Sequence, residues 1–244
     1  MESVFGGFTP DSFALFRELA RNNSKQWFDA HRPRYEAHVQ GVFRGLLVAL
    51  EPALLRLNPY FETSGRTNGN FSRINRDIRF SKDKSPYKSN YYLYVFDRRR
   101  KRASDGRLYV GLSADCVTVG FSIYGTWGKG PKGTLETVFR PRFEKDRATC
   151  LRIVERVVKP RRYETYWHRQ EKGEWMLHPG LPRKDKDWLT LHAWIVRKVF
   201  EPGARDLATP AFARRVEKIF RELYPLYALT SVASARWKAA VQRK

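Results

Sequence analysis

The stretch "RLYVGLSADCVTVGFSIY", residues 107–124, is rich in β-branched and aromatic residues and is interrupted once, by "SAD" at its centre. Such residues favour strands, while Ser and Asp favour turns, so the stretch predicts two antiparallel strands joined by a short turn. Residues 88–96, "KSNYYLYVF", have the same character and predict a strand before them. The charged segment "DRRRKRASDG", residues 97–106, is then a hairpin loop, and a meander of at least three antiparallel strands follows.

Upstream of these strands, residues 9–57 carry the signals of an all-helical part. Proline is tolerated in the first turn of a helix, so Pro10 and Pro33 are each predicted to lie at a helix start. Ser24 is predicted to cap a short helix between them. The third helix is predicted to end or kink at Pro52. Its buried stripe, at helical spacing, consists of Tyr35, Val39, Val42, Phe43, Leu46 and Leu50.

Further elements are predicted between and after these two regions. Residues 71–75 predict a short strand that leads into the most charged part of the chain. Residues 163–177 predict one or two strands, and residues 187–200 predict a helix that passes into a strand. The last helix is predicted to open at Pro210 and to end at Pro225.

Together these segments predict an α+β fold, in which an antiparallel sheet is flanked by N-terminal and C-terminal helices. The length of 244 residues and the 42% of hydrophobic residues suffice for a substantial core. We therefore expect a single domain over residues 1–244, with a helical part at 9–57 and a mixed sheet and helix part at 70–230.

The charge of the chain departs most from average composition. Lys and Arg number 47 against 25 Asp and Glu, which gives a net charge of +22 at pH 7. Because a core cannot hold so much unpaired charge, the excess lies on the surface, where it attracts polyanions such as nucleic acid. A basic soluble protein with no such partner has the same composition.

The compartment is predicted from what the sequence lacks. The two cysteines, Cys116 and Cys150, have no metal-ligand spacing and fit a reducing compartment. The N-terminus has no signal-peptide pattern, and no apolar run approaches the ~20 residues of a membrane span. We expect a cytoplasmic protein without a membrane span.

The stretch "RINRDIRFSKDKSPYK", residues 73–88 and here called the basic loop, carries six basic side chains and two carboxylates. It lies between two predicted strands, a common place for binding residues, and Arg and Lys suit phosphate oxygens. The alternative is an Arg–Asp network that pins a long loop to the helical part. The candidate ligand-binding residues are Arg73, Arg76, Asp77, Arg79, Ser81, Lys82, Asp83, Lys84, Tyr87, Lys88 and Trp27.

Other patterns are weaker. Residues 98–102 are interpreted as a solvated hairpin tip. The segment "RRYETYWHR", residues 161–169, interleaves rings with positive charge, as single-stranded nucleic-acid surfaces do, but an alternating strand produces the same pattern and is favoured. The five histidines form no metal-ligand pattern, and phosphate-loop and dinucleotide motifs are absent from the sequence. No cofactor and no metal site are predicted.

The order of segments resembles that of a bacterial and fungal family known only as domain of unknown function 2461. The specific part is the R-D-x-R-F-S-x-D-K-x-P-Y-K pattern from Arg76 to Lys88, and it is supported by Asn23, Trp27, Phe28 and Tyr35. The resemblance covers most of the chain and implies one domain close to full length with no established activity. The strongly basic balance and the "DRRRKR" hairpin differ from the family pattern.

Three functions fit these observations. The first is a binding module for a phosphate-bearing anionic ligand, with nucleic acid ahead of a phosphorylated small molecule. The second is a hydrolase or transferase acting on a phosphorylated substrate, with Asp77 or Asp83 as general base or Mg²⁺ ligand. The third is a structural or partner-binding protein in which the basic loop is only scaffold. We expect the first, and the sequence leaves the oligomeric state open.

Overall fold

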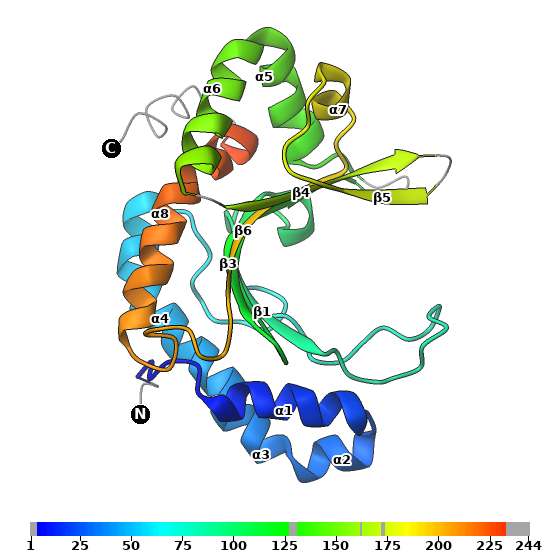
Figure 1. Ribbon diagram of the computed structural model, residues 1–244, viewed down its shortest axis with the longest axis vertical. Coiled ribbons are helices and arrows are strands. Elements are labelled where there is room, and N and C mark those ends of the chain that lie inside the picture. Colours follow the sequence, from blue (N-terminus) through cyan, green and yellow to red (C-terminus); the bar gives the residue numbers. More distant parts are fainter. Residues whose placement is uncertain (1–3, 127–130, 162, 172–173, 233–244) are drawn as a thin grey trace. The chain divides into compact units, whose positions relative to one another are not determined.

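The computed structural model describes residues 4–126, 131–161, 163–171 and 174–232 (Figure 1). The chain divides into two compact units, one of Met1–Val95, Val110–Thr118 and Val199–Glu217, and one of Phe96–Tyr109, Val119–Lys198 and Lys218–Lys244. The helical elements are α1 (Pro10–Arg21), α2 (Lys25–Ala30), α3 (Arg32–Tyr35), η1 (Glu36–Gly41), α4 (Val42–Leu57), η2 (Arg102–Ser104), η3 (Leu135–Phe139), α5 (Arg140–Lys145), α6 (Arg147–Val158), η4 (Lys159–Arg161), α7 (Asp185–Leu189) and α8 (Ala211–Ser231). The strands are β1 (Asn90–Val95), β2 (Arg107–Ser113), β3 (Val117–Tyr124), β4 (Glu164–Glu171), β5 (Glu174–Pro179) and β6 (Ala193–Phe200).

The strands form one six-stranded antiparallel sheet in the order β1-β2-β3-β6-β4-β5. The predicted α+β class, with helices before and after the strands, is confirmed. So is the meander β1-β2-β3, with its turn at Ser113, whose N–H donates to the Cys116 carbonyl over 3.0 Å. In the second unit β4 pairs with β5 from Tyr166↔Pro179 to Glu171↔Glu174. The predicted change from helix to strand at residues 187–200 is also present, as α7 and β6.

The helical N-terminal part of the first unit follows its capping signals. Thr9 has extended backbone before α1, and Pro10 is the first helical residue. The Ser24 side chain accepts a hydrogen bond from the backbone N–H of Trp27 at the start of α2, as the sequence predicts. Pro33 lies in the first turn of α3. Figure 1 shows α1, α2 and α3 side by side in this unit.

Helices continue through both interior prolines. The predicted end of the last helix at Pro225 is therefore wrong, while at Pro52 the helix does not end and the predicted alternative, a kink, stays a prediction. α4 runs through Pro52 to Leu57, and α8 runs through Pro225 to Ser231. A proline in a helix removes one hydrogen bond, to the carbonyl four residues earlier. Val48 and Arg221 hold those positions and are exposed, so water can satisfy their carbonyls. Burial continues beyond each proline and stabilises the helix there; the fully buried residues after Pro225 include Leu226, Tyr227, Ala228 and Leu229.

The predicted strand at residues 71–75 is also wrong. Phe71 and Asn75 form only isolated bridges, to Leu93 and Tyr87 respectively. At Ser72 the pairing with β1 is irregular. The Ser72 N–H donates to the Tyr92 carbonyl, but the Tyr92 N–H donates to the Ser72 side chain and not to its carbonyl. Side-chain pairing here replaces part of the backbone ladder.

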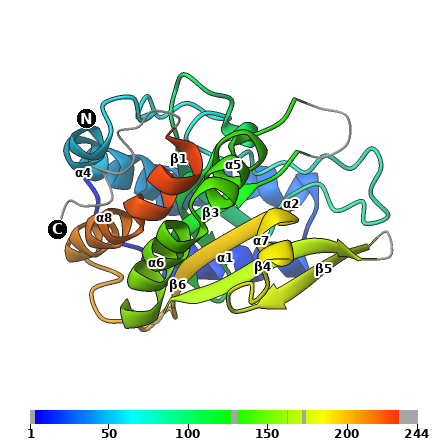
Figure 2. The ribbon, with the colours of Figure 1, turned by 90° about the horizontal axis from the view of Figure 1, so that it is seen from above.

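Each unit has an aromatic core of its own. In the first unit the Tyr91 ring lies 5.9 Å from the Tyr35 ring and 5.1 Å from the Phe43 ring, which joins β1 to α3 and α4. In the second unit Trp194 on β6 is fully buried and lies 5.4 Å from Trp188 on α7. Figures 1 and 2 show α5, α6 and α7 on one side of the β4–β5 hairpin in that second unit. Such ring clusters fix the elements on which the loops are mounted.

Candidate functional site

The basic loop starts from a short two-stranded base. The Arg76 N–H donates to the Pro86 carbonyl over 2.8 Å, and the Lys88 N–H donates to the Ile74 carbonyl over 2.8 Å. Both bonds join the outgoing chain to the returning chain. The loop beyond them, drawn in blue-green, extends away from β1 (Figure 1). The two ends of the loop are therefore joined to each other at its base, although only the strand that follows the loop, β1, is present as predicted.

The base is attached to the helices of the same unit through Tyr87. The Asn23 side-chain amide donates to the Tyr87 carbonyl over 2.9 Å, and its oxygen accepts from the Tyr87 N–H over 3.0 Å. The Tyr87 ring stacks on Phe28 of α2 with centroids 4.1 Å apart. The Asn23 side chain thus makes the two backbone hydrogen bonds with Tyr87 that a neighbouring strand would make. This gives a physical reason for the presence of Asn23 in the family pattern.

Both carboxylates of the loop bind arginines of the same loop. Asp77 accepts from Arg79 over 2.9 Å and 2.7 Å, and these bonds lower its pKa to about 2. Asp83 accepts from Ser85 and is ion-paired with Arg76, and these bonds lower its pKa below the usual range. The ion pairs shape the tip of the loop rather than join it to the helices. They differ in this from the pinning network that the sequence left as an alternative.

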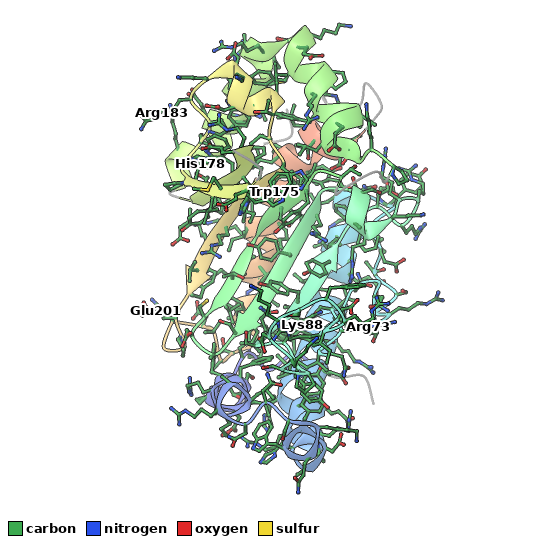
Figure 3. The ribbon with its side chains drawn as sticks, turned by 90° about the vertical axis from the view of Figure 1, so that its right-hand side faces the viewer. Arg73, Lys88, Trp175, His178, Arg183 and Glu201 are labelled. Carbon is green, nitrogen blue, oxygen red and sulfur yellow. The ribbon has the colours of Figure 1, made fainter. Side chains whose placement is uncertain are left out.

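The cations of the loop differ in how they are held. The side chains of Arg73 and Lys82 are exposed, and neither side chain has a hydrogen-bond or ion-pair partner among the described residues. Lys84 Nζ donates to the Ile78 carbonyl over 3.0 Å, and Lys88 Nζ donates to the Arg73 carbonyl over 2.8 Å. Figure 3 labels Arg73 and Lys88 at the base of the loop. The loop therefore carries a cationic excess on an exposed surface, which attracts phosphate groups.

Phe80 is the residue of this loop that sequence reasoning missed. Its side chain is 95% exposed, and the guanidinium of Arg79 lies 5.8 Å from its ring centroid. An open ring beside an arginine is an arrangement on which a nucleic-acid base can stack. The signal in the sequence was a single aromatic residue among charges, outside any helical or strand periodicity.

The other predicted aromatic residues have covered rings. Tyr87 is 5% exposed and Tyr91 is 2% exposed, so both belong to the core. Trp27 is half-buried and stacks on His31 with centroids 4.0 Å apart. Ser81 contributes its hydroxyl as an acceptor for Arg76 over 3.4 Å. Of the predicted site residues, the structure thus brings together those of the loop itself and places Tyr87 in its base, while Trp27 lies on α2 against His31.

The two weaker basic segments have structural roles where they are described. In the β1–β2 hairpin, Arg99 binds the buried carboxylate of Asp97 over 2.9 Å. Along β4, Tyr163 and Trp167 are buried and Glu164 is exposed, as the alternating-strand interpretation predicts. Arg162 of the same segment lies outside the described residues.

Neither a metal-ligand cluster nor a membrane-spanning helix is present in the described part of the chain. There, no three His, Cys, Asp or Glu side chains lie close enough to hold a metal ion. The metal-dependent enzyme therefore gains no ligand set from this region. Cys116 and Cys150 are both free thiols. None of the described helices has the length and apolar character needed to cross a membrane.

The comparison with known families agrees with the resemblance predicted from the sequence. The family described as "Conserved hypothetical protein (DUF2461)" matches residues 11–228, which include the basic loop and its anchor Asn23. No curated protein matches the chain. Because the match spans most of its length, the chain belongs to the family described as "Conserved hypothetical protein (DUF2461)".

Proposed function

We propose that this protein is a nucleic-acid-binding module and that the basic loop is its contact surface for a single strand. The observation that carries the proposal is Phe80, an aromatic side chain 95% exposed at the tip of a loop with unmatched cations. Base stacking needs an open ring face, and phosphate binding needs cations beside it. Phe80 supplies the first. Lys82, two residues along the chain, and Arg73, at the base of the same loop, supply the second.

The local structure of the loop supports this assignment in a second way. Its base is held by Asn23 and by the Tyr87–Phe28 stack, so binding would order only the tip. Ordering less chain on binding costs less conformational entropy. The internal pairs Asp77–Arg79 and Asp83–Arg76 further limit the shapes of the tip. The cytoplasmic location expected from the sequence accords with such a partner and stays a prediction.

The first experiment measures binding of a labelled single-stranded oligonucleotide by fluorescence anisotropy across a salt series. Phe80→Ala is expected to weaken binding about 5- to 100-fold, because stacking on an aromatic side chain contributes about 1–3 kcal/mol per base. Phe80→Tyr retains a ring and is expected to bind like the wild type. Tyr60→Ala removes another exposed ring from the same unit, 42% exposed, and is the matched control.

The charge of the loop is tested in the same assay with two double variants. Arg73→Gln/Lys82→Gln removes an exposed Arg and Lys from the loop, and Arg98→Gln/Lys101→Gln removes an exposed Arg and Lys from the β1–β2 hairpin. Each phosphate neutralised on a single strand contributes about −0.7 to the slope of log K against log salt. The loop variant is therefore expected to flatten the slope by about 1.4, and the hairpin variant to leave it unchanged.

Three outcomes would contradict the proposal. One is equal loss in the loop and hairpin variants, which would indicate attraction by total charge alone. Another is unchanged oligonucleotide affinity in Phe80→Ala. The third is loss of binding to anionic lipid vesicles in Phe80→Ala with oligonucleotide binding intact, which would assign the exposed ring to a membrane surface instead.

A further inference from the structure

The second unit contains a pocket that the basic loop does not share. Its volume is about 580 Å³, within the range of about 300–1,000 Å³ that small-molecule sites occupy. The lining comes from α5, β4, β5, α7 and the segment after α7. Its residues are Arg140, Arg169, Glu171, Trp175, Lys186, Leu189, Thr190, Leu191 and His192.

The positive charge of this pocket is only partly neutralised. Arg169 is held by Glu171 over 2.6 Å and is also paired with Asp187, so it has two carboxylate partners. Lys186 is exposed, and its side chain has no hydrogen-bond or ion-pair partner within the described ranges. Arg140 donates from one terminal nitrogen to the Leu191 carbonyl over 2.8 Å, and it has no carboxylate partner among the described residues. Two cations therefore remain for an anionic group.

The Nε atom of Arg140 adds a second indication. It is buried, and it has no hydrogen-bond partner among the described residues. A buried donor without a partner is costly, by about 1–3 kcal/mol, so such donors are rare unless a ligand or water completes them. An anion at this side of the pocket would have the Arg140 guanidinium and the Lys186 ammonium as its two charged partners.

Trp175 gives the pocket an aromatic surface in addition to its cations. Its indole, on β5 and labelled in Figure 3, is 38% exposed. It lies over the His192 ring, with centroids 3.8 Å apart. Burial lowers the pKa of His192, so the imidazole beneath the indole is neutral near pH 7. A supported and partly open indole is a surface on which a planar ring can stack. Glu171 and Thr190 add hydrogen-bonding oxygens to the same lining.

We propose that this pocket binds a phosphorylated small molecule with a planar ring, of which a nucleoside monophosphate is the simplest form. Lys186 and Arg140 would bind the phosphate, and Trp175 would stack on the ring. The site lies wholly in the second unit, so it stands on residues other than those of the proposed nucleic-acid surface.

The test is isothermal titration of the full chain with adenosine monophosphate, adenosine and inorganic phosphate. Saturable binding of adenosine monophosphate is expected, at least about tenfold tighter than that of either fragment, since a charged hydrogen bond or a stacked ring is each worth that much. Lys186→Ala is expected to weaken it about tenfold or more. Trp175→Ala is expected to weaken it similarly, while Trp175→Phe retains the ring and most of the affinity.

Lys184→Ala is the matched control, because Lys184 is equally exposed, lies two residues from Lys186 and is absent from the lining. It should change the affinity less than twofold. The proposal is overturned if adenosine monophosphate does not saturate, if phosphate alone binds equally well, or if Lys184→Ala and Lys186→Ala act alike. Phe80→Ala separates the two proposals, because it should weaken oligonucleotide binding and leave adenosine monophosphate binding intact.

Discussion

The basic loop of the first unit and the pocket of the second unit contain the same kinds of residue but differ in what surrounds them. In the loop, Asp77 and Asp83 are exposed and form ion pairs with arginines of the loop itself, and the Phe80 ring is open to solvent. In the pocket, Arg169 is fixed by two carboxylates and the Trp175 ring is supported on one side by His192.

This difference bears on what each region can bind. An exposed loop with cations and one open ring suits an extended polyanion, whose charges can be contacted along the chain. A lined pocket with two unmatched cations suits a compact anion that fits within its volume. Counts of Arg, Lys and aromatic residues do not distinguish the two cases; burial and partners do.

The largest effect is expected from truncating the aromatic support of each region. Phe28 is 1% exposed and stacks on Tyr87 in the first unit, and Phe143 is 2% exposed and stacks on Trp188 in the second. Replacing either with Ala should lower the free energy of unfolding by about 3–5 kcal/mol, measured by urea denaturation. Under native conditions Phe28→Ala should weaken oligonucleotide binding only, and Phe143→Ala should weaken nucleotide binding only. The reverse pattern would break the assignment of ligands to regions.

The next largest effect is a pH dependence of the free energy of unfolding, which differs between a buried carboxylate and the exposed carboxylates of the loop. Asp105, in the second unit, accepts from the Tyr227 hydroxyl over 3.0 Å, and burial raises its pKa from 3.8 to about 6. Between these values the folded state holds more protons than the unfolded state, so stability falls as pH rises through the window. The loss between pH 4 and pH 7 should be about 2.4 kcal/mol.

Asp105→Asn is the variant that isolates this contribution, because it cannot ionise. Denaturation curves of the wild type and the variant, run at pH 4 and pH 7, should show the additional loss in the wild type alone. Asp77 has the opposite sign, since its pKa is lowered to about 2 and its contribution is lost only as pH falls toward that value. Parallel pH profiles for wild type and Asp105→Asn would disprove the effect.

A smaller effect is expected at the anchor of the loop. Asn23→Ala leaves the N–H and the carbonyl of Tyr87 without their partner, which should cost about 1–3 kcal/mol in urea denaturation. Asn23→Asp keeps the acceptor and should cost less. Asn22→Ala is the control, because that side chain bonds only one exposed carbonyl, that of Glu18, and should change stability least. An equal effect of the two alanine variants would mean that the anchor adds nothing.

The smallest effect is expected from the exposed pair at the loop tip. Asp77→Asn should leave the denaturation midpoint unchanged, because exposed ion pairs contribute little to stability. It removes a negative charge beside the proposed binding surface, so oligonucleotide affinity should rise, by no more than about fivefold. Glu164→Gln, an exposed pair with Arg197 in the second unit, serves as control and should leave affinity unchanged. Weaker binding by Asp77→Asn would show that the carboxylate itself contacts the ligand.

Local patterns predicted the fold well where the signal was local. The capping role of Ser24 and the turn between β2 and β3 depend on neighbours in sequence, and both are confirmed. The predicted helix end at Pro225 was wrong, because whether a helix continues past a proline depends on the burial of the residues beyond it. That information is tertiary.

The candidate site divides in the same way. The sequence alone determined the concentration of charge in the basic loop and the position of that loop directly before a strand. It also determined the family to which the chain belongs. Only the tertiary structure decided that Tyr87 is buried while Phe80 is open, and that Arg140, Lys186 and Trp175 line one pocket. The physical reason is that charge and capping act between neighbours in the chain, whereas burial and ligand geometry depend on residues far apart in sequence.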